Sequence, residues 1–334
     1  MNAPIETAWV GGMYFQRALP EFGIDAVRIP HESPGVLDWD DVVARAGFEP
    51  QLVIYADRSL PPPLLGIERF PCLTGFYCID SHIHGWYPTY AQGFDFCALS
   101  LKDDLPSFRG RLGAERLLWL PPCPSAHHAA PAEPPEKTWD LLFAGTVDPE
   151  TTPERHRFLA RLKRTLPELE VRRGNFAELF PKARLVLNIA ERGDLNFRVF
   201  EALACGACLV TPRIANGQDE LFRDGEHLFT YDPADTDGLV ALVRELLADP
   251  ARMSRVAAAG HAEVERAHRA RNRAETLARF VRSLDAETVV AERLRVADAV
   301  HAGYLRVIYL HWAEELRGTP LGERYLHAGM RRPA

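Results

Sequence analysis

Short apolar runs alternate with amphipathic segments along the first part of the chain. The runs are rich in leucine, valine and isoleucine, which is typical of strands buried on both faces. Segments whose apolar side chains recur every three or four positions lie between them and predict helices. The expected strands are 7–10, 25–29, 51–55, 73–79, 94–101 and 116–120, and the expected helices include 13–19, 39–46, 88–92 and 105–112. This alternation predicts a parallel sheet covered by helices on both faces.

The same alternation returns at residue 139. Strands are expected at 140–143, 169–172, 184–189, 207–211 and 227–231, and helices at 153–165, 176–180, 196–204, 219–222 and 236–248. From residue 251 to 316 the pattern is helical, with breaks expected near Gly260, Leu284 and Gly303. Residues 317–334 are expected to be irregular or to form a short helix.

A stretch rich in proline and alanine separates the two alternating regions, and proline favours extended chain. His127 and His128 lie in it and are expected to be exposed. The sequence therefore predicts an α/β protein with two doubly wound, Rossmann-like domains. The expected parts are an N-terminal domain (1–121), a linker (122–138), a C-terminal domain (139–284) and a helical C-terminal extension (285–334).

Composition narrows the class of protein. The 334 residues are 47% hydrophobic and 25% charged, as in an ordinary globular protein of about two domains. The net charge of −7 argues against general nucleic-acid binding. No apolar run approaches the roughly 20 residues that span a bilayer, and no signal peptide is visible, so a cytoplasmic location is expected.

The six cysteines are sparse and lie mostly in apolar runs, which predicts buried free thiols. Cys205 and Cys208 match the CxxC pattern. However, this pair closes a predicted helix and enters a strand, whereas a thioredoxin-like pair opens a helix.

The segment 184–213 combines strand, polar loop, short helix and strand. Asn188 lies near the carboxyl end of the first strand, Asp194 stands where it would cap the helix, and Asn196, Arg198 and Glu201 are polar residues of the first helical turns. Ligands of parallel sheets bind beyond the carboxyl ends of strands, against helix N-termini. Arginine suits a phosphate there and glutamate a sugar diol. A solvated Arg198–Glu201 ion pair is an equally good interpretation of the spacing.

In each domain, a turn that contains glycine follows the first expected strand. Gly145 and Thr146 expose backbone N–H groups and a hydroxyl that would cradle an anion, although an ordinary turn explains them as well. Arg155, on the next helix, is a candidate to face the same site. Gly11 and Gly12 allow close approach of a ligand, but they are not a full dinucleotide fingerprint.

Asp80, His82 and His84 follow the fourth strand of the N-terminal domain. A histidine paired with a carboxylate acts as a general base near neutral pH. The spacing of the two histidines also permits a metal site, but no third ligand lies nearby in sequence. Capping of the local turn is the structural alternative.

Asp38, Trp39 and Asp40 form a DxD motif, which holds a divalent metal in some glycosyltransferases. Here the motif precedes an apolar helical pattern. Helix N-capping and complementarity to the helix dipole explain it, so no metal site is predicted.

Taken together, these segments resemble the CgeB-like (glycosyl transferases group 1) branch of the GT-B glycosyltransferases. The similar segments are FAGT (143–146), LNIAERGDLNFRVFEALACGACLVT (187–211), DELFRDGEHLFTYD (219–232) and the helix 239–268. In the first domain, IDSHIHGWYP and WLPP resemble the same branch more weakly.

The resemblance implies a nucleotide-sugar donor held mainly by the C-terminal domain, with no cofactor. By position, Arg198 would contact the diphosphate and Glu201 the ribose. Gly145 and Thr146 would line the phosphate site, and Gly206 would allow close packing behind it.

The resemblance also bears on mechanism. Arginine and the helix dipole would stabilise the departing diphosphate without a metal, and His82 or His84 would activate the acceptor hydroxyl if the enzyme inverts. Retaining relatives carry a second glutamate before the one matched by Glu201, and Gly193 stands at that position. Retention or inversion therefore stays open, as do the donor sugar and the acceptor. The alternatives are a GT-B-type epimerase or phosphorylase and a non-catalytic nucleotide-sugar-binding protein.

Overall fold

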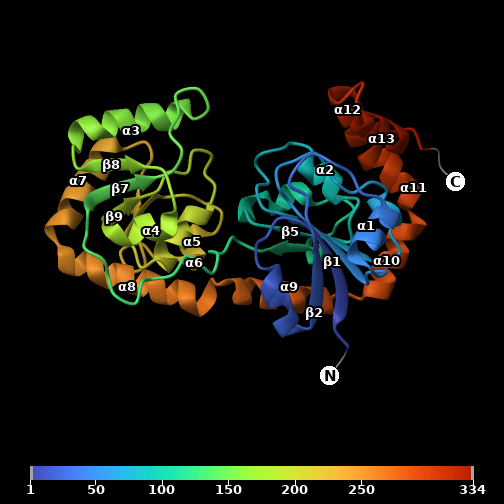
Figure 1. Ribbon diagram of the computed structural model, residues 1–334, viewed down its shortest axis with the longest axis horizontal. Helices are drawn as coiled ribbons and strands as arrows, with labels where there is room; N and C mark the ends of the chain where they lie inside the picture. The colour runs from blue at the N-terminus through green and yellow to red at the C-terminus, as the bar shows by residue number, and fades with distance from the viewer. Residues whose placement is uncertain (1–2, 332–334) are drawn as a thin grey trace. The chain divides into compact units, whose positions relative to one another are not determined.

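The computed structural model describes residues 3–331, which divide into two compact units (Figure 1). Of these residues, unit 1 comprises 3–121 and 273–331, and unit 2 comprises Pro122–Asn272. The first boundary lies at 121/122, and the expected linker 122–138 belongs to unit 2. The second lies at 272/273 instead of 284, because most of helix α9 (Ala270–Ser283) packs on unit 1.

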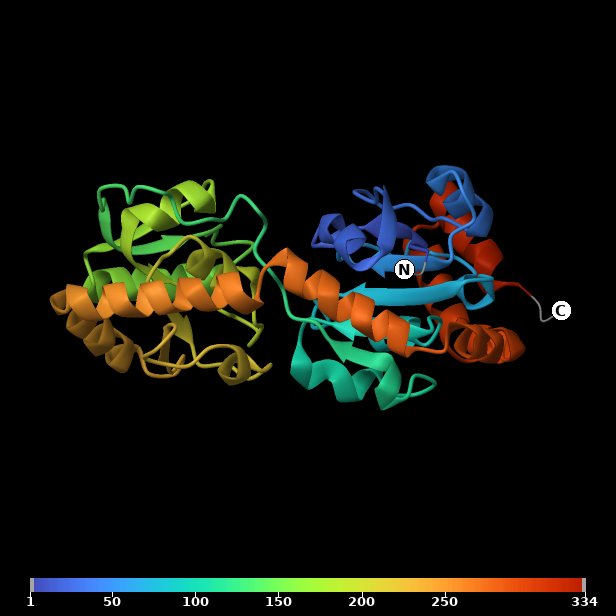
Figure 2. The same cartoon turned by 90° about the horizontal axis from the view of Figure 1, so that it is seen from below.

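Contacts of α9 explain the shift of this boundary. Nε of Arg273 donates to the carbonyl of Pro121 (2.8 Å), and the ring of Phe280 packs edge-on against Phe96 with centroids 5.6 Å apart. Arg282 donates to the carbonyl of Phe22. Figure 2 shows α9, in orange, along the sheet of unit 1.

The sheet of unit 1 has six parallel strands in the order β2-β1-β3-β4-β5-β6. These strands are β1 (Ile5–Gly11), β2 (Ile24–Ile29), β3 (Leu52–Ala56), β4 (Leu73–Cys78), β5 (Phe96–Leu99) and β6 (Leu117–Trp119). All six were predicted. Their order places a topological switch between β1 and β3, where successive connections leave on opposite faces.

The connecting helices of unit 1 are short. They are η1 (Gln16–Phe22), α1 (Trp39–Ala46), η2 (Ile67–Arg69), α2 (Tyr87–Ala91), η3 (Lys102–Phe108) and η4 (Ala114–Arg116). The bounds of α1 match the prediction. The helices predicted at 13–19 and 105–112 are 3₁₀ helices that contain Pro20 and Pro106, and proline removes an α-helical hydrogen bond.

The C-terminal extension is helical and belongs to the core of unit 1. It contains α10 (Ala286–Arg295), α11 (Ala297–Val300), the π-helix η6 (His301–Leu305), α12 (Arg306–Glu315) and α13 (Pro320–Gly329), and α12 and α13 lie side by side in red in Figure 1. Ile308, Tyr309 and Tyr325 pack into the same apolar cluster as Val10 and Val53 of the sheet. The expected break near Leu284 separates α9 from α10, and the one near Gly303 coincides with the π-helix.

Unit 2 has five parallel strands in the order β11-β10-β9-β7-β8. The strands are β7 (Trp139–Ala144), β8 (Leu169–Arg172), β9 (Ala183–Leu187), β10 (Leu209–Pro212) and β11 (Phe229–Tyr231). The helices within this unit are α3 (Pro153–Thr165), α4 (Phe176–Leu179), η5 (Phe180–Lys182), α5 (Phe197–Ala204), α6 (Gln218–Leu221), α7 (Thr236–Ala248) and α8 (Pro250–Ala267). The bounds of α3 and α7 match the predictions.

The predicted helix break at Gly260 is wrong. Gly260 lies inside α8, where a Cβ atom would stand 2.1 Å from the carbonyl oxygen of His227 and 2.8 Å from Leu203. The glycine therefore permits close packing of α8, and the helix ends at its C-cap His268 instead.

All six cysteines are free and buried, as predicted. Within the described part of the chain, no helix is both long and apolar enough to cross a membrane.

Candidate functional site

The topological switch of unit 2 lies between β7 and β9. Gly145 and Thr146 follow β7, and Asn188 follows β9, so these residues lie at the carboxyl edge of neighbouring strands. Nδ2 of Asn188 donates to Oγ1 of Thr211 (3.0 Å), which fixes its amide within the edge. Ligands of doubly wound sheets bind at such a switch.

Arg198, on the first turn of α5, points into this edge. Its guanidinium lies over the ring of Phe143 (5.3 Å to the centroid) and over that of Phe176 (5.4 Å), and Nη1 donates to Oδ1 of Asn188 (3.4 Å). A Cβ atom on Gly145 would stand 2.9 Å from Nη2 of Arg198, so a larger residue there would shift the guanidinium.

Charge compensation at Arg198 is incomplete. Nε is buried without a hydrogen-bond partner, and the side chain forms no ion pair within residues 3–331. Burial lowers the pKa of Arg198, and the nearby cation Arg155 lowers it further, but a guanidinium stays charged at neutral pH. Glu201, Asp194 and Glu191 lie near enough to offset part of this effect, but none forms an ion pair with Arg198 in the described chain, so a bound anion would complete the compensation of its charge.

The N-terminus of α5 adds to the positive character of this edge. The N-cap residue is Asn196, not Asp194 as expected, and its side chain does not cap the helix. Nδ2 of Asn196 donates to the carbonyl of Ile189 (3.2 Å), while its Oδ1 is buried without a partner. No side chain therefore caps this end of α5, and its positive helix dipole next to Arg198 favours an anion.

Arg155, on α3, links the two loops of this edge. Nη1 donates to the carbonyl of Thr146 (2.9 Å), and Nη2 lies 3.1 Å from Oε2 of Glu191 in the loop after β9. One cavity of about 400 Å³ is lined by Gly145 and Thr146, and another of about 370 Å³ by Arg155 and Glu191. Arg155 is thus already engaged in holding the loops that surround the open space.

Glu201 lies one turn after Arg198, and the predicted alternative of a solvated ion pair between them is wrong. The side chain of Glu201 is 14% exposed and lies 3.8 Å from Nε2 of His128. Burial raises the pKa of Glu201, while the charge of Arg198 acts in the opposite direction. The carboxylate therefore stands in a protected position from which it can accept a hydrogen bond from a ligand hydroxyl.

His128 was expected to be exposed, but it is 4% exposed. The carbonyl of His128 accepts a hydrogen bond from Nη1 of Arg269 (2.7 Å), which draws this part of the linker onto unit 2. Burial, together with the neighbouring His127 and Arg269, lowers the pKa of His128 to about 4. The imidazole is neutral at neutral pH and does not form an ion pair with Glu201.

The stability of the protein is expected to fall in mild acid because of His128. Below its usual pKa of about 6.5 the unfolded chain binds a proton at this position, whereas the folded protein does not until about pH 4. Between pH 7 and pH 5 this difference costs about 1–2 kcal/mol. Urea unfolding at both pH values should show a smaller loss for His128→Gln than for the wild type. His127→Gln, at the exposed neighbour, should behave as wild type; equal losses in all three proteins would contradict the assignment.

Two glycines shape the ends of α5. Gly206 has a φ of 70°, the left-handed conformation expected where the helix stops. Gly193 also has a φ of 70°, and its carbonyl accepts a hydrogen bond from Nδ2 of Asn216 (2.9 Å). The space beside Gly193 is open, because a Cβ atom there would meet nothing within 4 Å.

The switch point of unit 1 carries the second group of candidates. Gly11, which ends β1, has a φ of 106°, and a Cβ atom there would stand 2.2 Å from the carbonyl oxygen of Ala56. Gly12 follows and donates its N–H to that same carbonyl (3.0 Å). These glycines allow β1 and β3 to end close together, so the structure explains them without a ligand.

Sequence reasoning missed Asp57, which follows β3 at this edge. It is fully buried and accepts hydrogen bonds from the hydroxyls of Tyr55 (3.1 Å) and Tyr87 (2.7 Å) and from the N–H of Ser59 (3.0 Å). Burial raises the pKa of Asp57. The rule that selected Asp80, a carboxylate directly after a buried strand, selects Asp57 equally well.

The histidine loop after β4 lies at the same edge. Nε2 of His84 lies 3.2 Å from the carbonyl oxygen of Ser59, and a carbonyl only accepts hydrogen bonds, so Nε2 carries the proton and Nδ1 is the basic nitrogen. Oγ of Ser59 donates to Oδ2 of Asp80 (3.4 Å). Nδ1 of His82 is buried without a hydrogen-bond partner. The carbonyl of Ser59 therefore orients the ring of His84, a role for which the carboxylate of Asp80 was the sequence-based candidate.

The DxD motif has the capping role predicted for it. Asp38 is the N-cap of α1, where its Oδ1 accepts from the N–H of Asp41 (3.1 Å) in a capping box. Arg324 forms ion pairs with the carboxylates of Asp38 and Asp41.

Comparisons with known proteins agree with this architecture. Residues 155–279 match the glycosyl transferase-like family. No curated protein matches the sequence. Among solved structures, sucrose-phosphate synthase from Thermosynechococcus elongatus is similar with a TM-score of 0.59 at 11% identity, over 83% of this chain and 98% of that one.

Two further solved structures have the same architecture. Anabaena HepE, solved in complex with UDP and glucose, has a TM-score of 0.57 at 10% identity, over 84% of this chain and 100% of its own. A glycosyltransferase from Rickettsia africae has a TM-score of 0.54 at 9% identity, over 90% of this chain and 99% of that one. The chain thus has the GT-B fold, two Rossmann-like domains with a helical C-terminal region, and its segment 155–279 is glycosyl transferase-like in sequence.

Proposed function

We propose that the protein is a glycosyltransferase that takes a sugar from a nucleoside-diphosphate sugar held by unit 2. The observation that carries this proposal is Arg198 at the topological switch, whose Nε is buried without a hydrogen-bond partner and whose side chain forms no ion pair with the described residues. The family match contains both Arg198 and Glu201. HepE, which shares the fold, has been solved with UDP-glucose.

Each polar group of the edge has a place in this proposal. Arg198 and the N-terminus of α5 bind the diphosphate, and Gly145 and Thr146 line its site. Asn188 orients Arg198 through its side-chain oxygen. Glu201, protected beside His128, accepts hydrogen bonds from the ribose.

The remaining donor-side candidates have supporting roles. Arg155 holds the loops after β7 and β9 together through Thr146 and Glu191. Asn196 begins α5, and Gly206 lets the chain leave that helix without a side chain in the way.

The proposed mechanism needs no metal. Arg198 and the dipole of α5 stabilise the negative charge that develops on the departing diphosphate. His84, with its proton on Nε2, offers Nδ1 as the base for an acceptor hydroxyl. His82 is the second candidate base, with Asp80 nearby in sequence. Membership of the CgeB-like branch and transfer of a hexose are further parts of the proposal.

A non-catalytic nucleotide-sugar-binding protein is the second candidate. Gly193 favours it, because this residue stands where retaining relatives are expected to carry a glutamate, and the space beside it is open. Such a protein would retain donor binding but show no turnover, and variants of His82 and His84 would leave it unchanged. Release of free sugar or isomerised donor without an acceptor would indicate an epimerase or phosphorylase instead.

A thermal-shift screen of nucleotides and nucleotide sugars tests the proposal. We expect at least one nucleoside-diphosphate sugar to raise the melting temperature, since ligands that bind only the folded state stabilise it. The corresponding nucleoside without phosphates should give a smaller shift. No shift with any nucleoside diphosphate or its sugar conjugate would contradict donor binding.

A further inference from the structure

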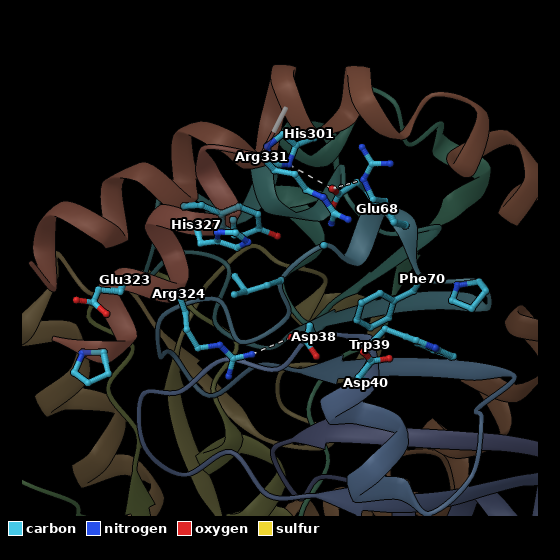
Figure 3. A pocket seen from close by; sticks show the side chains of 17 residues that line it. Asp38, Trp39, Asp40, Glu68, Phe70, His301, Glu323, Arg324, His327 and Arg331 are labelled. Atoms are coloured by element: carbon cyan, nitrogen blue, oxygen red, sulfur yellow. Dashed lines mark hydrogen bonds and ion pairs between the residues drawn. The ribbon is translucent and has the colours of Figure 1, made fainter. Parts of the chain in front are cut away.

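Unit 1 contains a cavity of about 680 Å³ away from its candidate catalytic edge. It lies between η2, the N-terminus of α1 and the C-terminal helices, as Figure 3 shows. None of the residues that line it follows β1, β3 or β4 directly, so Gly11, Asp57 and His84 do not belong to it. The cavity is therefore separate from the groups assigned to the transfer reaction.

Glu68 of η2 is the unusual residue of this cavity. Its side chain is 0% exposed, yet neither carboxylate oxygen accepts a hydrogen bond. Nδ1 of His301 lies 3.3 Å from Oε1 and Nε of Arg69 lies 3.6 Å from it, but neither contact meets hydrogen-bond geometry. Buried carboxylates normally accept several hydrogen bonds, so Glu68 has unused acceptor capacity.

His301 lies directly beside Glu68, and a dashed line joins the two side chains in Figure 3. It is 6% exposed, and both of its ring nitrogens lack a hydrogen-bond partner. His301 also begins the π-helix His301–Leu305, and such distortions of helices occur frequently at functional sites. Two buried groups with unused hydrogen-bonding capacity thus lie side by side in the lining of one cavity.

The rim of the cavity combines donors, acceptors and an aromatic face. Arg331 and His327 are exposed and form no ion pair with the residues that the structure describes, and Nη1 of Arg331 would lie 3.6 Å from a Cβ atom on Gly66. Asp40 is an exposed acceptor, and the half-buried ring of Trp39 lies beside it. Vicinal hydroxyls use donors and acceptors at once, and the C–H face of a sugar ring packs on aromatic rings.

We propose that this cavity is a binding site for a saccharide. Ligand hydroxyls donate to Glu68 in the wall and to Asp40 at the rim, while Arg331 and His327 donate to ligand oxygens. Trp39 supplies the apolar contact. The cavity volume is within the range of small-molecule sites and accommodates a disaccharide. This inference does not rest on the proposed donor site.

Ligand-observed NMR on the full chain tests the proposal, with cellobiose, maltose and glucose 6-phosphate as probes at concentrations up to about 10 mM. We expect at least one probe to bind, and its affinity to fall about fivefold or more in Glu68→Gln and in Arg331→Gln. Arg331→Gln changes an exposed residue, so it keeps the test valid if Glu68→Gln fails to fold. Arg317→Gln, whose exposed arginine pairs with Glu314 outside the cavity, is the matched control and should bind as wild type.

Competition separates this site from the donor site. Saturating UDP and the variant Arg198→Ala should leave saccharide binding unchanged. If glucose 6-phosphate binds more tightly than the neutral sugars, Arg331 and His327 bind an anionic group of the saccharide. If the affinities are equal, these two residues bind sugar hydroxyls. Absence of binding by every sugar, binding of inorganic phosphate alone, or binding that both Glu68→Gln and Arg331→Gln leave intact would overturn the proposal.

Discussion

Replacing Arg198 by alanine is expected to weaken binding of a nucleoside diphosphate by about 10- to 100-fold, because hydrogen bonds from a charged donor to an anion contribute about 1.5–3 kcal/mol. The guanidinium is held by Phe143, Phe176 and Asn188, so its position is set before the ligand arrives. A preorganised cation loses little side-chain entropy on binding. Isothermal titration with UDP measures the effect.

The same substitution should lower the free energy of unfolding only modestly, by about 1–2 kcal/mol. It removes the contacts with the rings of Phe143 and Phe176 and the hydrogen bond to Asn188, but it breaks no ion pair in the described chain. Arg164→Ala, at an exposed arginine of α3, is the matched control and should keep the wild-type affinity. An Arg198→Ala protein that binds UDP as tightly as wild type would contradict the assignment of the diphosphate site.

Replacing Arg293 by alanine is expected to destabilise unit 1 by about 3–5 kcal/mol, the usual loss when one partner of a buried ion pair is removed. Arg293 and Asp95 are both 0% exposed, and Nε of Arg293 lies 2.9 Å from Oδ1 of Asp95. The guanidinium also donates to the carbonyls of Ile67, Phe70 and Cys72. The substitution leaves a buried carboxylate and three carbonyls without this donor.

Urea unfolding measures this loss, and Arg295→Ala, at an exposed arginine on the same helix, is the control. A loss below about 1 kcal/mol for Arg293→Ala would show that the buried pair is not needed. The expected result would instead show that α10 folds together with residues 1–121. Arg293 on this helix joins the C-terminal extension to Asp95, just before β5, and to carbonyls in η2 and the loop that follows it.

The strands of both sheets could be predicted because each is a short apolar run bounded by polar or glycine residues. All eleven lie within a few residues of their expected bounds. Helices were harder where tertiary contacts override local preference. Gly260 reads as a helix break, but close approach to the His227 carbonyl keeps α8 continuous.

The site could be predicted only in part. Asn188, Arg198 and Gly145 were found because the carboxyl edge of a parallel sheet is readable from strand ends. The rings that flank Arg198 and the burial of His128 were not, since residues 143, 176 and 128 reach this place through long-range packing. The Glu68–His301 pair joins residues far apart in the sequence, and no local pattern marks it.

A crystal structure of the chain soaked with UDP tests the central claim most directly. The account predicts diphosphate oxygens within hydrogen-bond distance of the Arg198 guanidinium, next to Gly145 and Thr146, with the ribose hydroxyls at Glu201. A diphosphate bound away from Arg198, or an empty edge at saturating UDP, would contradict it.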